Sequence, residues 1–329
     1  MAALFFTRSE TASILDLSTP GKVKQIGNDA KIAPHSFGPI TINKDREGIL
    51  WAYIGGFGGL SILNLSDYSE RKWEGELFSL GEPIAPSAFI VRKKAPYIHA
   101  LGGYQRLPTV GEGVLTTLDI TNPTEIKATS KNSLFGAIHY SIAMSKDERY
   151  AYVTNSLHKS LSLFSLVDDA KNPKNIGSDL ELPGSLTPLF LTTSGDGFLS
   201  YVNCVDKIAI LSLMNPGSPA YLGSLCLPSL AFRNPVVPLH NKPFAYLCTD
   251  DGTLCLFNAS ESSIKSSSID LRAKSFVIAE DDLSGYILHD DNKVSSVSLV
   301  DPFYPRILNT WDLPFSDVLA LAILPSQNA

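Results

Sequence analysis

Short, largely apolar runs with a polar residue at their centre recur along the chain at similar intervals. The seven runs are ILDLS, ILNLS, TLDIT, LFSLV, ILSLM, LFNAS and SVSLV, with polar positions at Asp16, Asn64, Asp119, Ser165, Ser212, Asn258 and Ser298. Asp16 and Ser298 are separated by six intervals with a mean of 47 residues, and seven such periods span the 329 residues. A repeat of this length that contains several short strands is typical of a β-propeller.

Each repeat contains four strand-like runs separated by turn-forming residues. In residues 137–182 the runs AIHYSIAMS, YAYVTNS, SLSLFSLV and NIGSDLEL are separated by KDER, LHK and DDAKNPK. This order predicts a four-stranded antiparallel meander, whose inner strand is apolar because both of its faces are buried. We therefore predict an all-β fold, a seven-bladed β-propeller with four-stranded antiparallel blades. The predicted single domain 1–329 is divided into blade 1 (1–32 plus 317–324), blade 2 (33–82), blade 3 (83–133), blade 4 (134–183), blade 5 (184–229), blade 6 (230–271) and blade 7 (272–316).

The two ends of the chain complement each other. The first repeat has no inner strand before ALFFTR, whereas DVLALAIL at 317–324 is an apolar run with no repeat after it. We expect this C-terminal strand to join the N-terminal blade, since such closure removes exposed sheet edges and joins both ends of the ring. A short helix over 317–324 is the alternative.

Several repeats resemble known propeller repeats. LDITNPTEI (118–126) and SLMNPGSPAYLGSL (212–225) resemble the LVIVD-type bacterial propeller repeat. SKDERYAYVTNSLHKSLSLFSL (145–166) resembles the YVTN-type blade, which is also seen in phosphogluconolactonase-like propellers. The resemblance implies a seven-bladed fold. It does not imply an activity, because propellers carry many unrelated functions.

Net charge and the distribution of apolar residues limit the partners and the cellular compartment that we expect for this protein. A net charge of −6 argues against nucleic-acid binding, which needs a basic surface. No apolar run approaches the roughly 20 residues of a membrane span, and the start MAALFFTRSE lacks the basic region of a signal peptide. We therefore expect a cytoplasmic protein that binds neither nucleic acid nor membrane. We also expect a monomer, because a closed ring is self-sufficient.

The four cysteines predict no metal centre. Cys204, Cys226, Cys248 and Cys255 form no CxxC pair, and no histidine lies at zinc-ligand spacing from them. Each lies in an apolar strand, so we expect buried reduced thiols; a Cys248–Cys255 bridge across one hairpin is the alternative. The glycine-rich stretches match no phosphate-binding motif, and we predict no cofactor.

Candidate binding residues gather at the upper mouth of the predicted ring, the face at which the inner strands begin. Cationic and titratable groups that precede inner strands could bind a carboxylate or phosphate there. In blade 3 an insertion, GGYQRLPTVGEG (102–113), lengthens the loop between the second and third strands, and it carries residue types enriched at interfaces. The alternative for the groups at the mouth is that they are ordinary loop residues. The alternative for the insertion is that it is a tolerated surface insertion. The predicted ligand-binding residues are His35, Tyr104, Arg106, His139, Arg233, Arg272, Lys274 and Asp317.

No complete catalytic set is evident. The chain has no GxSxG elbow, and its six histidines are spread over different repeats, which argues against an iron centre. We name no catalytic or metal-ligating residue and predict a non-enzymatic protein-interaction module, whose protein partner contacts a rigid propeller face with the elaborated blade-3 loop. The alternative is a lactonase-like hydrolase, or a binder of a small anionic ligand, at the upper mouth. There His35 and His139 could serve as general bases near neutral pH.

Overall fold

The structure, a computed structural model, consists of β-strands and loops. No helix occurs among the described residues, so none of them forms a helix long and apolar enough to cross a bilayer. The structure describes residues 3–32, 40–45, 47–56, 59–66, 75–79, 88–103, 113–123, 125–134, 141–177, 179–184, 186–232, 234–242, 244–258, 263–270 and 273–325.

The strands form seven antiparallel sheets, each described here from its inner to its outer strand. Blade 1 consists of β29 (Ala320–Ile323), β1 (Ala3–Thr7), β2 (Thr11–Asp16) and β3 (Lys24–Lys31). Blade 2 consists of β4 (Ile40–Lys44), β5 (Leu50–Gly56), β6 (Gly59–Asn64) and β7 (Gly75–Ser79). Blade 3 consists of β8 (Ala88–Val91), β9 (Tyr97–Gly103), β10 (Gly113–Asp119) and β11 (Lys127–Leu134). Blade 4 consists of β12 (Ile142–Met144), β13 (Tyr150–Asn155), β14 (Ser160–Ser165), β15 (Lys174–Asn175) and β16 (Leu180–Glu181).

The remaining three blades follow the same order. Blade 5 consists of β17 (Phe190–Thr193), β18 (Leu199–Asn203), β19 (Val205–Ser212) and β20 (Ala220–Ala231). Blade 6 consists of β21 (Val237–Pro238), β22 (Phe244–Cys248), β23 (Thr253–Asn258) and β24 (Ser263–Asp270). Blade 7 consists of β25 (Ala273–Ile278), β26 (Ser284–His289), β27 (Lys293–Ser298) and β28 (Arg306–Asp312).

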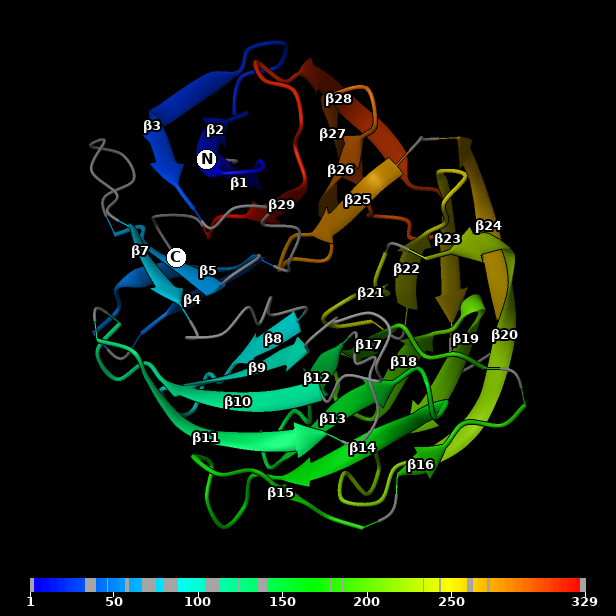
Figure 1. Cartoon of the computed structure of the whole chain (residues 1–329). Helices are drawn as coiled ribbons and strands as arrows, with labels where there is room; N and C mark the ends of the chain where they lie inside the picture. The colour runs from blue at the N-terminus through cyan, green and yellow to red at the C-terminus, as the bar shows by residue number, and fades with distance from the viewer. Residues whose placement is uncertain are drawn as a thin grey trace.

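The sheets are arranged in a ring, with the first strand of each near the centre (Figure 1). The predicted seven-bladed β-propeller is confirmed, including its closure by the C-terminal strand. Strand β1 lies between β2 and β29, and it pairs with β29 from Leu4 opposite Ile323 to Thr7 opposite Ala320. Both ends of the chain therefore belong to one blade, which joins the first repeat to the last.

The recurring polar residue has a local role at the end of the third strand. Asp16, Asn64 and Asp119 are the last residues of β2, β6 and β10. Their side-chain oxygens accept hydrogen bonds of 2.8–2.9 Å from the backbone N–H two residues further on. Such Asx turns redirect the chain as the strand ends, and serine forms the same turn more weakly. Ser165 and Ser212 accept longer bonds of 3.3 and 3.4 Å in blades 4 and 5.

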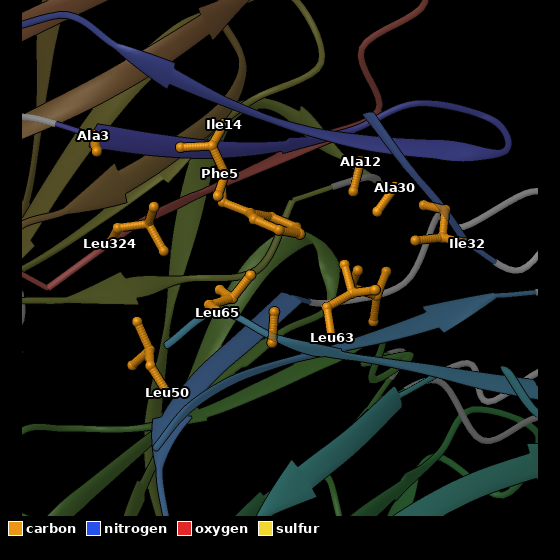
Figure 2. Packing of buried hydrophobic residues seen from close by; sticks show 12 residues of the cluster. Ala3, Phe5, Ala12, Ile14, Ala30, Ile32, Leu50, Leu63, Leu65 and Leu324 are labelled. Carbon is orange, nitrogen blue, oxygen red and sulfur yellow. The ribbon is translucent and has the colours of Figure 1, made fainter. Parts of the chain in front are cut away.

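The hydrophobic core lies between the blades. Each gap between neighbouring blades holds one cluster of buried side chains among the described residues. In the gap between blades 1 and 2, Phe5 and Leu324 of blade 1 are buried near Leu50 and Leu63 of blade 2 (Figure 2). Because these contacts join residues distant in sequence, each blade depends on both of its neighbours for burial.

Blade 4 departs from the predicted four strands. Its outer segment forms two short strands, β15 and β16, which pair with opposite ends of β14. Gly177 lies between them with φ of 92°, a conformation that ordinary residues rarely adopt. The left-handed residue interrupts the extended backbone, so the outer strand is divided.

Candidate functional site

A cavity of about 1650 Å³ follows the central axis of the ring and is lined by the inner strands. Each inner strand begins at the upper face, so loops before inner strands and loops between second and third strands lie on that face. The walls are mostly apolar, with side chains such as Ile42, Phe89, Phe190 and Phe276. A cavity of this kind holds few polar groups, and these therefore decide which ligand it accepts.

Lys274 is the one lysine or arginine among the described residues that line this cavity. It is the second residue of β25, close to the upper mouth, and its side chain is half-buried. Its Nζ donates a hydrogen bond of 2.7 Å to the backbone oxygen of Val318. An ammonium group has three donors, so two remain for a ligand in the cavity. The predicted ligand-binding residue Lys274 thus lies where its side chain could bind a ligand in the cavity.

Asp317 precedes the residue that Lys274 contacts. It is exposed and has a φ of 62°, a left-handed conformation that Asp tolerates better than most residues. Ser316 Oγ lies 3.5 Å from its Oδ1. Asp317 is not among the described residues that line the cavity. Lys274 therefore contacts Val318, the residue that follows Asp317 in the sequence. Of these two predicted ligand-binding residues, only Lys274 lines the cavity.

Arg8 supports the same upper loop, and our sequence analysis did not include it. Its guanidinium lies over the ring of Phe315, 4.6 Å from the centroid, and it forms an ion pair with Asp29. It also donates to Ser13 Oγ at 3.2 Å, while Ser13 Oγ donates to Asp29 at 2.7 Å. Arg8 is in the turn between the second and third strands of blade 1. Because loops between second and third strands lie on the upper face, the sequence alone could have assigned Arg8 to that face.

The other six predicted residues lie outside the described part of the chain. They are His35, Tyr104, Arg106, His139, Arg233 and Arg272, and the loop 104–110 lies outside it as well. Two of their described neighbours in sequence, Ser141 and Asn234, line the cavity. Asn234 is held by its neighbours, since its Nδ2 donates to Cys248 O at 3.1 Å and its backbone oxygen accepts from Asn203 Nδ2 at 2.9 Å.

The lower end of the cavity is acidic. Glu280 and Asp281 line it beside His240. The buried carboxylate of Asp282 accepts bonds of 2.7 and 2.6 Å from the backbone N–H groups of His240 and Asn241, and it contacts His240 Nδ1 at 2.9 Å. Burial alone would raise the pKa of Asp282, but these hydrogen bonds outweigh it and lower the pKa. Lys274 and the acidic groups therefore lie at opposite ends of the axis.

His99 is buried between blades 3 and 4, away from the mouth. It is fully buried in β9, on the same face as Leu101, which packs in the cluster between these blades. Nδ1 lies 3.1 Å from Thr117 Oγ1, and Nε2 is buried without a partner among the described residues. Burial, with a smaller effect of nearby Arg92, lowers its pKa to about 3. His99 is therefore a neutral structural imidazole.

The cysteines are all free thiols. Cys255 lies opposite Leu247 in the hairpin, so the side chains of Cys248 and Cys255 point to opposite faces and the alternative bridge does not form. Cys226 is exposed, contrary to our expectation, because it lies on the outward face of the outer strand β20. Within the described ranges, no three His, Cys, Asp or Glu side chains are grouped closely enough to hold a metal ion.

Comparison with known proteins gives structural relatives only. No protein-family model matches the chain, and no curated protein matches it in sequence. A Bacteroides uniformis protein named as a 6-phosphogluconolactonase matches with a TM-score of 0.76 and 11% identity, over 98% of this chain and 99% of that chain. The periplasmic gluconolactonase of Pseudomonas aeruginosa gives 0.73 and 14%, over 98% and 99%. Sqt1 of Chaetomium thermophilum, bound to the N-terminus of a ribosomal protein, gives 0.63 and 15%, over 94% and 84%.

At these identities the likeness establishes the fold. It also corrects our functional prediction. Three proteins that match nearly the whole chain with higher TM-scores than Sqt1 are named as lactonases. The prediction of a non-enzymatic interaction module is therefore wrong, and the comparisons favour the alternative that we gave for it.

Proposed function

We propose that the protein is a lactonase-like hydrolase that binds a small anionic lactone at the upper end of the axial cavity. The observation that carries the proposal is Lys274, a lysine with two donors that have no partner among the described residues, in an otherwise largely apolar cavity. An ammonium group in such surroundings attracts a carboxylate or phosphate more strongly than it does in water. The lactonase names of the structural relatives support the same reaction.

Lactone hydrolysis requires few groups. Water attacks the carbonyl carbon, the ring C–O bond breaks, and the product is an open hydroxy acid. A base must accept the proton from water, and a donor must stabilise the negative charge on the carbonyl oxygen. Imidazole titrates near neutral pH, so His35 and His139, which precede β4 and β12 in the sequence, are our proposed bases.

The remaining predicted residues have proposed roles in binding. Arg233, Arg272 and Lys274 would hold the anionic substituent of the substrate. Tyr104 and Arg106, from the blade-3 insertion, and Asp317 would contact its sugar ring. We further propose that the seven repeats are divergent members of the LVIVD and YVTN types, because the motifs at 118–126, 145–166 and 212–225 resemble them.

The proposal is tested with a pair of sugar lactones that differ only in a phosphate group. Hydrolysis is followed in a pH-stat and corrected for the spontaneous rate. Lys274→Met should raise KM for the phosphorylated lactone about tenfold or more, since a charged hydrogen bond contributes about 1.5–3 kcal/mol. KM for the neutral lactone should not change.

Lys293→Met is the matched control. Lys293 belongs to the same blade, its side chain is 42% exposed, and it is not among the described residues that line the cavity. It should leave both KM values unchanged, while His35→Gln and His139→Gln should lower kcat. Failure of the wild-type protein to accelerate either lactone would reject the hydrolase. Equal effects of the two lysine variants would reject the assignment of the anion site to Lys274.

A further inference from the structure

Asn234 lies at the upper mouth of the axial cavity, in the blade next to that of Lys274. It lines the cavity shortly before β21, the inner strand of blade 6, while Lys274 lines it from the start of β25 in blade 7. The side chain of Asn234 is half-buried. A polar group in a largely apolar cavity helps to decide which ligand is accepted. Asn234 is thus a candidate for ligand binding that our sequence prediction did not include.

The orientation of the Asn234 carboxamide is fixed by its partner. Its Nδ2 donates a hydrogen bond of 3.1 Å to the backbone oxygen of Cys248. A carbonyl oxygen only accepts hydrogen bonds, so the nitrogen of the carboxamide, and not its oxygen, must face Cys248. The carboxamide oxygen of Asn234 has no partner among the described residues. It can therefore accept a hydrogen bond from a ligand.

The backbone of Asn234 is held as well. Asn203 is fully buried at the end of β18, and its Nδ2 donates to the backbone oxygens of Ala231 and Asn234, both at 2.9 Å. The crossing from blade 5 to blade 6 is thus fastened at two residues by one buried carboxamide. Asn234 is held by Asn203 of blade 5 and by Cys248 of blade 6. A side chain that is ordered before the ligand arrives loses little entropy when it binds.

The turn after Asn203 has an unfavourable backbone. Val205 has a φ of 74°, in the left-handed region that β-branched residues rarely adopt. Its backbone N–H donates to Asn203 Oδ1 at 3.1 Å, so both ends of the Asn203 carboxamide are bonded. Strained backbone of this kind persists only where the surrounding structure imposes it, and it clusters at ligand sites. The strain at Val205 accompanies the placement of Asn203 and, through Asn203, of Asn234.

We propose that Asn234 is a specificity-determining residue, whose carboxamide oxygen accepts a hydrogen bond from a hydroxyl group of the lactone. This inference rests on the proposed function, and it narrows the substrate class to hydroxylated lactones with an anionic substituent. A carboxylate or a doubly ionised phosphate only accepts hydrogen bonds, so it binds the Lys274 ammonium and is repelled by the Asn234 oxygen. A hydroxyl group can donate to that oxygen. The two residues therefore orient the lactone, with its anionic substituent toward blade 7 and a hydroxyl toward blade 6.

The test is a series of sugar lactones that each lack one hydroxyl group. In the wild type, loss of the hydroxyl that Asn234 binds should raise KM about three- to tenfold, as expected for one neutral hydrogen bond. Asn234→Ala should raise KM for the parent lactone by the same factor. In this variant, loss of that hydroxyl should have no further effect, because its partner is already absent. A merely structural role of Asn234 would instead raise KM for every lactone equally.

Two further variants complete the test. Asn241→Ala is the matched control, since Asn241 is an exposed asparagine on the lower face of blade 6 and is not among the described residues that line the cavity. It should leave every KM unchanged. Asn234→Gln keeps the carboxamide but moves it by one methylene group, so it should also lose the discrimination, and it replaces Asn234→Ala if that variant does not fold. An unchanged KM in the Asn234 variants, or an equal rise for all lactones, would overturn the inference.

Binding of the same lactones, measured by titration calorimetry at mildly acidic pH, separates this inference from the proposed hydrolysis. Binding that depends on Asn234 and on one hydroxyl, without turnover, would support the role of Asn234 and reject the hydrolase. Turnover that does not depend on Asn234 would support the hydrolase and reject the role of Asn234. A wild-type protein that neither binds nor hydrolyses any of the lactones would overturn both.

Discussion

Replacement of His99 by glutamine should make the protein less sensitive to mild acid. His99 is fully buried, and its pKa in the folded protein is about 3 compared with 6.5 for an ordinary histidine. The folded state therefore keeps it neutral while the unfolded state takes up a proton below pH 6.5. Its contribution to stability is complete above pH 6.5 and is lost as the pH falls from there toward 3.

The magnitude follows from the two pKa values. Each pH unit below 6.5 lowers the free energy of unfolding by about 1.4 kcal/mol while His99 stays neutral, so the loss at pH 5 is about 2 kcal/mol relative to pH 8. At pH 5 this loss is insensitive to the folded pKa, which lies well below that pH. Aspartate contributes little in this window because its unfolded pKa is 3.8.

The assay is urea unfolding at pH 8, 6 and 5. Between pH 8 and 5 the wild-type protein should lose about 2 kcal/mol more than His99→Gln, whose side chain does not titrate. His158→Gln, a change at an exposed histidine of blade 4, controls for the loss of an imidazole and should follow the wild type. Parallel pH profiles for wild type and His99→Gln would refute a neutral, buried His99.

Two further substitutions test contacts between blades. Tyr246→Phe should lower the free energy of unfolding by about 1 kcal/mol, because the buried Tyr246 hydroxyl donates to Pro302 O of blade 7 at 2.7 Å; an unchanged urea midpoint would contradict this. Gly195→Ala should cost about 1–3 kcal/mol, since a Cβ there would lie 2.1 Å from the backbone oxygen of His240 in blade 6. Equal melting temperatures of wild type and Gly195→Ala would show that the two turns do not pack as described.

The fold was predictable because its signals are local. The polar residue at the end of each third strand, such as Asp16 or Asp119, forms a hydrogen bond only two residues away, so it recurs with the repeat. The closing strand β29, which lies within the predicted 317–324, was predictable for a related reason, because the first repeat lacked a strand and the last apolar run had no partner. The division of the outer strand of blade 4 at Gly177 was not predicted, since it depends on a backbone conformation.

The candidate site was predictable only in part. Lys274 could be assigned to the upper mouth, because the direction of the inner strands decides on which face their first residues lie. Its bond to Val318, and the stacking of Arg8 on Phe315, join residues from different blades or from opposite ends of the chain. Sequence spacing does not report such pairs, since they form only after the ring closes.

The sequence by itself determined that this protein has seven similar units, where each unit turns and which segment closes the ring, because strand periodicity and turn chemistry act within a few residues. The tertiary structure decided which side chains become neighbours across the blades. It made His99 neutral by burial, left Lys274 as the cation of the cavity wall in the described part of the chain, and placed Cys226 on an exposed edge. Burial, and the charge surrounding a group, are properties of packed blades, so they arise only when sheets from distant parts of the chain come together.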